Sequence, residues 1–353
     1  MEPEDQIVRY LEHSRASIAW SAVGQGPPLV IGGWWSSHLE LDWRNAKFRR
    51  FVGSLARHRT VIRYDRPGAG VSDRGALPAR SLEEELATLE ALIGEATPAP
   101  GAIALFGASS GGGVASLFAA RHPERVERLV LYGTYARGVD LAPPAAREAM
   151  LAIIDQHWGL GSRVLADLFL PDATAEERAE FVEFQRRSAS REVALASLRA
   201  VYDFDATGHL GDVLAPTLVL HRRDDRAIPF ALGKDVAGRV RNARFVALEG
   251  DDHFPWRGDS DSVVRETLAF LGVPVASGQS GIATGAAAGS TRLTDREREV
   301  LRLVARGQTD AEIAAHLVLS AHTVHRHIAN IRTKLGVPSR TAAAAWALRN
   351  ELI

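Results

Sequence analysis

The sequence predicts an α/β domain with a mostly parallel sheet, followed by a small all-α domain. Three observations lead to this fold class. Short apolar runs alternate with amphipathic helical segments over residues 1–272, the pattern of a sheet wound through βα units. Residues 273–290 are rich in Gly, Ala, Ser and Thr and hold no charged residue, a composition that predicts a flexible linker. Residues 291–353 then show apolar residues at helical spacing.

The composition limits the class of protein. A chain of 353 residues with 46% hydrophobic residues can fill the cores of two domains. It has no cysteine and therefore no disulfide bond, which suits a reducing cytoplasm. The N-terminal segment is acidic, unlike a signal peptide, and the long uncharged stretch 97–120 is interrupted by glycines. We therefore expect a cytoplasmic protein without a membrane span.

The elements of the first domain follow from the apolar pattern. Ser81 precedes a helical segment and Glu84 stands three residues later, so the pair predicts a capping box at the start of a helix over 81–95. Short apolar runs between such helices predict strands, and their alternation predicts a mostly parallel sheet. The predicted strands are 28–31, 60–64, 102–106, 128–132, 217–221 and 244–248.

The most specific motif of this domain is Gly107-Ala108-Ser109-Ser110-Gly111, which lies between a predicted strand and a helix. A serine on a sharp strand-to-helix turn needs small neighbours, because only then can the backbone adopt the strained turn and project the hydroxyl. Ser109 is therefore the candidate nucleophile. A serine hydroxyl is weak unaided, so the chemistry also needs a base and an acid that orients the base.

Candidates for both partners follow in the chain. Asp225 comes after one predicted strand and His253 comes after the next, so the order is Ser, Asp, His. Asp224 is an alternative to Asp225 as the acid. The neighbouring Asp251 and Asp252 are interpreted as solvated loop charges, because a carboxylate on a loop is ordinarily exposed.

Two further segments point to a known family. Gly32-Gly33-Trp34 follows an early strand, and 64–73 follows the next one. Together with the serine motif they resemble the α/β-hydrolase fold over residues 6–272. Segments 37–43, 129–137 and 250–256 are similar to the subset of these domains joined to adenylate cyclase or LuxR-type regulator modules. The resemblance implies an oxyanion hole made by the backbone N–H groups of Trp34 and Ser110. Two tryptophans follow Gly33, so this loop either opens for water or instead fills space or clamps a ligand.

Residues 137–211 interrupt the sheet pattern with helical sequence, with helices predicted over 145–156, 163–169, 175–187 and 191–202. Such an insertion resembles the cap that covers the pocket of α/β-hydrolases. Its aromatic residues are candidates for an apolar pocket above Ser109, although aromatic residues at such spacing are also common in plain cores. The candidate pocket residues are Trp35, Trp158 and Tyr202, with Phe169, Phe181, Phe184 and Phe204 as further cap aromatics.

The small domain predicts three consecutive helices. The first lies between 293 and 307, where Thr294 and Glu297 can cap its start and Gly307 ends it. The second covers 310–317, and the third covers 322–335 behind a cap at 320. The third helix is apolar on one face, so the polar side chains of the other face can meet DNA. The candidate DNA-binding residues are Ser320, Thr323, His325, Arg326, Asn330, Arg332 and Lys334.

The segments 293–301, 312–314 and 320–335 resemble the LuxR/FixJ/GerE family of DNA-binding domains, and the resemblance covers the whole module. It implies double-stranded DNA as a partner, and we expect a homodimer on DNA. Residues 291–353 hold ten basic and six acidic residues, a net charge of +4 in a chain of net charge −1. That division of charge fits phosphate binding at one end only.

One position departs from the family pattern. His325 stands where lysine is usual, and because histidine is mostly neutral at pH 7, a phosphate contact there is weaker or depends on pH. The alternative of a zinc site formed with His322 and His327 is disfavoured, because these positions do not share a helix face and no cysteine is near. We expect no metal and no cofactor.

Two functions from different classes fit these patterns. In the first, the protein is a transcriptional regulator whose α/β domain senses a small apolar ester, lactone or acyl ligand. In the second, it is an active serine esterase with an appended DNA-binding domain. We favour the first, because a DNA reader requires a genomic output whereas a triad can persist as a ligand anchor. Slow hydrolysis that ends the signal would join the two.

The linker spans about 25 Å and is too soft to transmit torque, so a signal must pass by docking, release or dimerisation.

Overall fold

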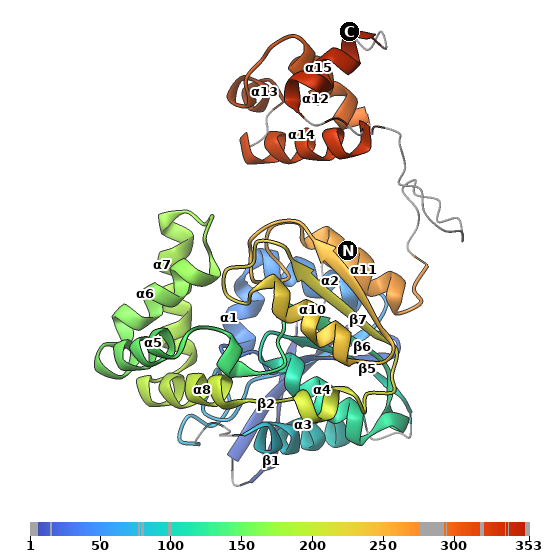
Figure 1. Ribbon diagram of the computed structural model, residues 1–353. Helices are drawn as coiled ribbons and strands as arrows, with labels where there is room; N and C mark the ends of the chain where they lie inside the picture. The colour runs from blue at the N-terminus through green and yellow to red at the C-terminus, as the bar shows by residue number, and fades with distance from the viewer. Residues whose placement is uncertain are drawn as a thin grey trace. The chain divides into compact units, whose positions relative to one another are not determined.

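A computed structural model describes residues 6–14, 16–76, 78, 81–97, 101–274, 293, 295–317, 321–335, 337 and 339–349, with the backbone alone at 295, 321–323, 325, 326, 329, 333 and 349. The chain divides into two units, Met1–Ala276 and Ser277–Ile353 (Figure 1). From position 275 onward the predicted linker 273–290 lies outside the described residues. Within the described part of the chain, no helix has the length and apolar character needed to cross a membrane.

A single sheet of eight strands organises the described part of the first unit, in the order β1-β2-β4-β3-β5-β6-β7-β8. Every pair from β4 to β8 is parallel, whereas β2 pairs antiparallel with both β1 and β4. The predicted mostly parallel sheet is therefore confirmed. The strands are β1 (Ile7–His13), β2 (Ala16–Val23), β3 (Pro28–Gly32), β4 (Thr60–Tyr64), β5 (Ile103–Ala108), β6 (Val126–Tyr132), β7 (Thr217–Arg222) and β8 (Ala243–Leu248).

Two strands were not predicted, the antiparallel pair β1 and β2. β1 forms the edge of the sheet, and its apolar side chains are not all directed inward: Ile7 is 63% exposed and Tyr10 is 56% exposed. Its apolar residues therefore lack the alternation that marks a half-buried strand. The six strands that were predicted are the parallel ones. Those from β3 to β7 are mostly buried and read as continuous apolar runs, whereas β8, at the other edge of the sheet, is mostly half-buried.

Helices cover both faces of this sheet (Figure 1). Along β5, Leu105 belongs to one hydrophobic cluster and Phe106 to the other, because successive side chains point to opposite faces. The first cluster includes side chains of α3 (Leu82–Ala96), α4 (Gly111–Arg121) and α10 (Phe230–Arg239). The second includes side chains of α2 (Ala46–Ala56) and α11 (Ser260–Phe270). The Ser81 hydroxyl caps α3 by accepting the N–H of Glu84 at 3.2 Å, as predicted.

A group of helices lies between β6 and β7, where the cap was expected. It consists of α5 (Pro144–Gln156), α6 (Trp158–Phe169), α7 (Ala175–Ser188), α8 (Arg191–Asp203) and the short α9 (Thr207–Leu210). α6 begins at Trp158 rather than at 163, because the His157 ring caps it by accepting the N–H of Leu160 at 3.0 Å. Side chains from α5, α6 and α8 form a separate hydrophobic cluster around Ile154, Leu165 and Leu198.

The second unit contains α12 (Asp295–Ala305), α13 (Asp310–Leu317), α14 (Ala321–Leu335) and α15 (Arg340–Arg349). Gly307 ends α12 as predicted, with a φ of 80° and the N–H of the next residue bound to the carbonyl of Leu303 at 3.2 Å. α15 was not predicted, because its alanine-rich sequence lacks a clear apolar face. Val300, Leu301, Ile313, Val324, Ile328 and Ile331 form the core of this unit together with Ala343 and Ala347 of α15.

Candidate active site and DNA-binding helix

Ser109 lies on the turn between β5 and α4. Its φ of 53° is in the left-handed region, which costs a residue other than glycine roughly 1–3 kcal/mol. Two hydrogen bonds hold the turn: the N–H of Ser109 donates to the carbonyl of Tyr132 at 3.0 Å, and the Thr134 hydroxyl donates to the carbonyl of Ser109 at 2.8 Å. The backbone therefore has the sharp bend that the serine motif predicts. Thr134 was not predicted as part of it.

Glycines around the serine allow the close packing of this turn. A Cβ at Gly107 would lie 2.8 Å from the carbonyl oxygen of Gly111, and a Cβ at Gly112 would lie 2.1 Å from the Thr134 hydroxyl. Both distances are too short for real Cβ atoms. A side chain at either position would therefore displace α4 or break the hydrogen bond that holds the carbonyl of Ser109.

The structure brings Asp225 and His253 together although 28 residues separate them. His253 Nδ1 and Asp225 Oδ2 are 2.9 Å apart, and both side chains are buried. The other carboxylate oxygen accepts the N–H groups of Ala227 at 2.9 Å and Ile228 at 3.0 Å. Asp224 is exposed instead, so Asp225 rather than Asp224 is the aspartate that contacts His253. Because a carboxylate only accepts hydrogen bonds, His253 donates from Nδ1, and in the neutral ring Nε2 is left as an acceptor for a serine proton.

A second histidine supports the aspartate loop. His221 is fully buried, and its Nε2 donates to the carbonyl of Ile228 at 2.8 Å. The same nitrogen lies 3.9 Å from Asp225 Oδ2. Burial lowers the pKa of His221, which favours the neutral ring. His221 therefore fixes the turn that supplies the two amide donors to Asp225, a role that its place at the end of β7 did not predict.

Ser109 and His253 line a cavity of about 20 Å³, which is room for about one water molecule. The ring of Phe169, at the end of α6, stacks on the His253 ring with centroids 5.3 Å apart and planes 23° from parallel. Phe254 covers another side of the same cavity. Phe169 of the cap and Phe254 of the loop after β8 therefore leave little room beside Ser109, and a ligand larger than water requires these rings to move.

Of the two candidate oxyanion donors, Trp34 lines this cavity and Ser110 follows Ser109 in the chain. Trp34 is only 7% exposed, with its ring centroid 5.2 Å from that of Trp256 and 6.3 Å from that of Phe48. The ring thus anchors the loop in the core. Ser110 immediately precedes α4, where the first backbone N–H groups of a helix have no partner within the helix.

A larger cavity of about 670 Å³ lies next to the Ser109 cavity. Phe254 and Trp256 line both cavities, so these two rings are the wall between them. The larger cavity is bordered by α1 (Leu39–Arg44), α2 and α7. Its volume is within the range of small-molecule sites. Its apolar lining includes Leu41, Leu170, Phe181 and Phe184.

The three predicted pocket residues lie in different places. Trp35 lines the Ser109 cavity. The ring of Trp158 packs against that of Trp35 at 6.3 Å and its Nε1 donates to the carbonyl of Ala189, so it supports the cavity from behind. Tyr202 of α8 lines a separate cavity of about 270 Å³, where the Arg147 guanidinium lies over its ring. The structure therefore does not bring Tyr202 to Ser109.

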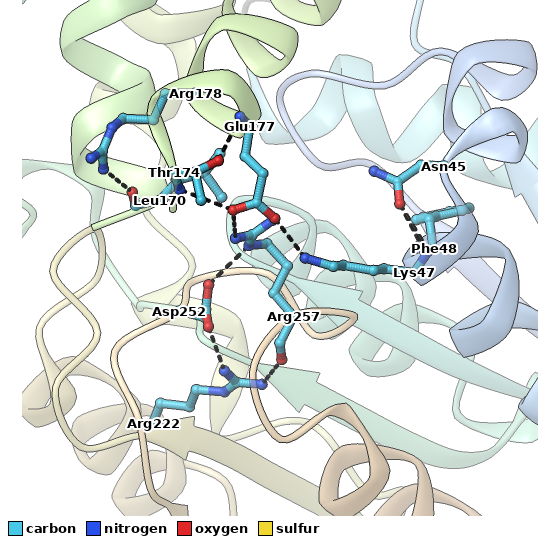
Figure 2. A network of polar contacts seen from close by, with 10 residues as sticks. All are labelled: Asn45, Lys47, Phe48, Leu170, Thr174, Glu177, Arg178, Arg222, Asp252 and Arg257. Carbon is cyan, nitrogen blue, oxygen red and sulfur yellow. Dashed lines mark hydrogen bonds and ion pairs between the residues drawn. The ribbon is translucent and has the colours of Figure 1, made fainter. Parts of the chain in front are cut away.

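One carboxylate joins the cap to the sheet domain (Figure 2). Glu177, in the first turn of α7, binds Lys47 of α2 at 2.6 Å and Arg257 of the loop after β8 at 3.3 Å. It also accepts the N–H of Thr174 at 3.0 Å and so completes a capping box for α7. The hydrogen bond from Lys47, followed by that from Arg257, lowers the pKa of Glu177 to about 2. We call this group the cap latch.

The latch continues into the sheet domain. Arg257 binds Asp252 at 3.0 Å, and Asp252 in turn lies 3.7 Å from the guanidinium of the buried Arg222. The prediction that Asp252 is a solvated loop charge is therefore wrong. Arg257 is five residues further along the same loop, whereas Arg222 belongs to β7 and its approach depends on the folded chain rather than on local sequence.

We expect Glu177→Gln to loosen the cap without unfolding it. Glutamine can still accept the N–H of Thr174, whereas the ion pairs to Lys47 and Arg257 are lost. A partly exposed ion pair contributes up to about 1 kcal/mol, so backbone amides of α7 should exchange with solvent deuterium up to about fivefold faster. Glu176→Gln, an exposed neighbour, is the matched control. Unchanged exchange in Glu177→Gln would contradict the latch.

The acidity of Glu177 also sets the pH range of the latch. The pKa of Glu177 in the folded protein, about 2, is below the ordinary value for glutamate of about 4.3. The stabilisation is therefore complete above the ordinary value and is lost as the pH falls toward 2.

The candidate DNA-binding residues lie in or beside α14. Ser320 is outside the described residues, as are the side chains of Thr323, His325 and Arg326, whose backbones lie in the helix. Asn330 is exposed. The predicted helix cap at Thr294 also lies outside the described residues.

Two further candidates of α14, Arg332 and Lys334, are half-buried. The Lys334 ammonium binds the buried carboxylate of Glu297 at 2.7 Å. Lys334 thus holds α14 against α12, and a phosphate contact by Lys334 would compete with this ion pair.

Comparison with known proteins agrees with the division of the chain into two units. A model of the alpha/beta hydrolase family matches residues 29–266, and a model of bacterial regulatory proteins of the luxR family matches residues 291–347. The structure is similar to a hydrolase from Pseudomonas aeruginosa, with a TM-score of 0.64 and 25% identity over 75% of this chain and 98% of the other.

Curated relatives match one part or the other. A pimeloyl-[acyl-carrier protein] methyl ester esterase of Nitrosospira multiformis is 24% identical over 278 residues, which cover 72% of this chain and 98% of the esterase. The transcriptional regulatory protein LiaR of Bacillus subtilis is 49% identical over 61 residues, 17% of this chain and 29% of LiaR. The chain also spans 12% of the length of a polyketide synthase of Burkholderia thailandensis, at 28% identity. This chain belongs to the α/β-hydrolase family and carries a LuxR-family DNA-binding domain in residues 291–347.

Proposed function

We propose that the protein is a transcriptional regulator whose α/β-hydrolase domain binds a small apolar ester, lactone or acyl compound and hydrolyses it slowly. One observation carries the proposal: Ser109 and His253 lie in a cavity of about 20 Å³ under an apolar cap, in a chain that also has a LuxR-family DNA-binding domain. The candidate nucleophile is Ser109, with His253 as the base and Asp225 as the acid that orients it. On DNA we expect a homodimer.

The closed cavity favours a sensor. An ester of several heavy atoms does not fit beside Ser109 until Phe169 and Phe254 move, so binding requires a change in the cap. Such differential binding to two conformations is what a ligand-controlled regulator needs. The adjacent cavity of about 670 Å³ supplies the volume once the shared wall opens. The acyl class is supported by the aromatic rings that line the Ser109 cavity and by similarity to a protein named as a methyl ester esterase.

The second candidate is an active serine esterase with a DNA-binding domain appended. The specific observation in its favour is the completeness of the acid and base, because both oxygens of Asp225 have partners and the His253 ring is oriented. A chain that retained Ser109 only as an anchor would not need this orientation. The two candidate functions predict different effects of ligand hydrolysis on the affinity of the chain for DNA.

Thermal unfolding of the full chain with esters, lactones and acyl compounds tests the proposal. A ligand at 100 times its Kd should stabilise the domain by about 2.7 kcal/mol, in the wild type and in Ser109→Ala alike. A sensor ligand should also change the affinity of the chain for DNA, and the change should last longer in Ser109→Ala. Consumption of the ligand without any change in DNA affinity would favour the esterase. Lack of stabilisation by every compound class would contradict the sensor.

A further inference from the structure

A buried arginine lies directly behind the two candidate oxyanion donors. Arg66 follows β4 in the segment 64–73, and its side chain is 4% exposed. One terminal nitrogen, Nη2, donates both to the carbonyl oxygen of Gly33 and to the Ser110 hydroxyl, the latter at 3.3 Å. The Ser110 hydroxyl in turn donates to the same carbonyl at 3.4 Å. Arg66 therefore joins the loop after β3 to the start of α4.

The carbonyl that Arg66 binds belongs to the peptide unit whose N–H is that of Trp34. A peptide unit is planar, and in its trans form the C=O and N–H point in opposite directions. With the carbonyl of Gly33 held on Arg66, the N–H of Trp34 faces away from the guanidinium. Trp34 lines the Ser109 cavity. A hydrogen bond accepted by the carbonyl also polarises the peptide and makes its N–H a stronger donor.

Glycines allow the loop that carries Trp34 and the turn that carries Ser110 to lie close together. Gly33 has a φ of 77°, and a Cβ there would lie 3.2 Å from the Tyr64 hydroxyl. A Cβ at Gly111 would lie 2.5 Å from the carbonyl oxygen of Gly32, so the first turn of α4 rests directly on the end of β3. The loop after β3 and the first turn of α4 are therefore closely packed against each other.

The arginine is itself held in place. Glu85 of α3 lies 3.1 Å from Arg66 Nε, and the glutamate side chain is 3% exposed. A buried charge is stable only with a partner, and a guanidinium can face two groups at once, with Nε toward one and Nη2 toward another. Lysine has one ammonium at the end of a flexible stem and cannot keep both contacts in this geometry.

We propose that Arg66, held by Glu85, is the positioning residue of the oxyanion hole, and that it directs the N–H groups of Trp34 and Ser110 toward the oxygen of an acyl group attached to Ser109. The inference rests on the proposed function in that Ser109 reacts with an acyl compound. The Ser109 oxygen adds to the carbonyl carbon, its proton passes to His253 Nε2, and the carbonyl oxygen takes the negative charge that the two N–H groups stabilise.

Arg66→Lys tests the proposal in the full chain. The probes are p-nitrophenyl butyrate and an alkylboronic acid, whose boron accepts the serine oxygen and forms a tetrahedral anion. We expect kcat and the affinity for the boronic acid to fall together, by about 10- to 100-fold, since removing one oxyanion donor costs about 10²–10³-fold and misorienting it costs less. KM should stay within a factor of two to three. A purely structural role would not make the two losses parallel.

Arg59→Lys is the matched control. Arg59 is equally buried, pairs with Glu127 at 2.6 Å and donates to the carbonyl of Leu271, but it precedes β4 at the opposite end of the sheet. It should lose stability and keep both kcat and boronic acid affinity. If Arg66→Lys does not fold, Arg66→Met combined with Glu85→Gln removes both charges and gives the same comparison.

Folded Arg66 variants with wild-type kcat and wild-type boronic acid affinity would overturn the positioning role and leave a reactive Ser109 standing. A wild type that neither cleaves the ester nor binds the boronic acid would instead overturn the reactive serine itself, and the inference with it. The two failures are therefore distinguishable in one set of measurements.

Discussion

Ser109→Ala is expected to lower the hydrolysis of a nitrophenyl ester by about 10⁴-fold or more, because the base then has no nucleophile to activate. The measurement is nitrophenol release in single turnovers, where even a slow enzyme gives a signal. DNA affinity in the absence of ligand should be unchanged, since the substitution deletes one oxygen atom in the other unit.

Ser116→Ala is the matched control for this experiment. Ser116 is also buried in α4, but its hydroxyl donates to the carbonyl of Gly112 within the helix at 2.8 Å. Its loss should leave hydrolysis intact. Equal rates in Ser109→Ala and the wild type would assign the chemistry to another residue, and no cleavage by the wild type at any acyl length would remove the esterase alternative.

DNA binding is expected to weaken about 10³-fold or more between 50 and 200 mM salt, if a dimer makes six or more phosphate contacts. The measurement is fluorescence anisotropy with a labelled duplex over a salt series. Arg326→Ala should cost about 1–3 kcal/mol if its guanidinium reads a base edge, and should relax specificity at one base pair. Binding that does not respond to salt would contradict a phosphate-dominated interface.

A charge-matched substitution separates the effect of net charge from that of the side chains on α14. Arg306 is exposed just after α12, outside the predicted reading helix. Arg306→Ala removes the same charge and should change the affinity by no more than about 0.5 kcal/mol. Equal losses in the two variants would mean that net charge, rather than the face of α14, determines binding.

The catalytic candidates were predictable because their signals are local. Ser109 is marked by the glycines on both sides of it, and Asp225 and His253 follow strands whose carboxyl ends meet at one edge of a parallel sheet. An apolar run that forms a strand, and a carboxylate in the loop after it, can each be recognised from a few residues of sequence. The fold class was predictable for the same reason, since parallel strands buried on both faces give unbroken apolar runs.

The surroundings of the site depend on contacts between distant segments and were not predictable in this way. Glu177 and Arg257 are 80 residues apart, and nothing near either of them indicates the other. Tyr202 shares the aromatic character of Phe169, yet only Phe169 reaches His253, because the packing of each cap helix decides which of its faces points inward. Helical periodicity identifies an apolar face but does not name the neighbour that covers it.

The closed cavity beside Ser109 has a consequence for the dose response of the regulator that we propose. If the open conformation holds one hundredth of the molecules, the apparent affinity for a ligand is about 100-fold weaker than its contacts allow. The cap latch sets this fraction, because Glu177 stabilises the closed form without lining the Ser109 cavity. Sequence changes at Lys47 or Arg257 would then shift the concentration at which transcription responds and, since both side chains also line the cavity of about 670 Å³, the fit of the ligand as well.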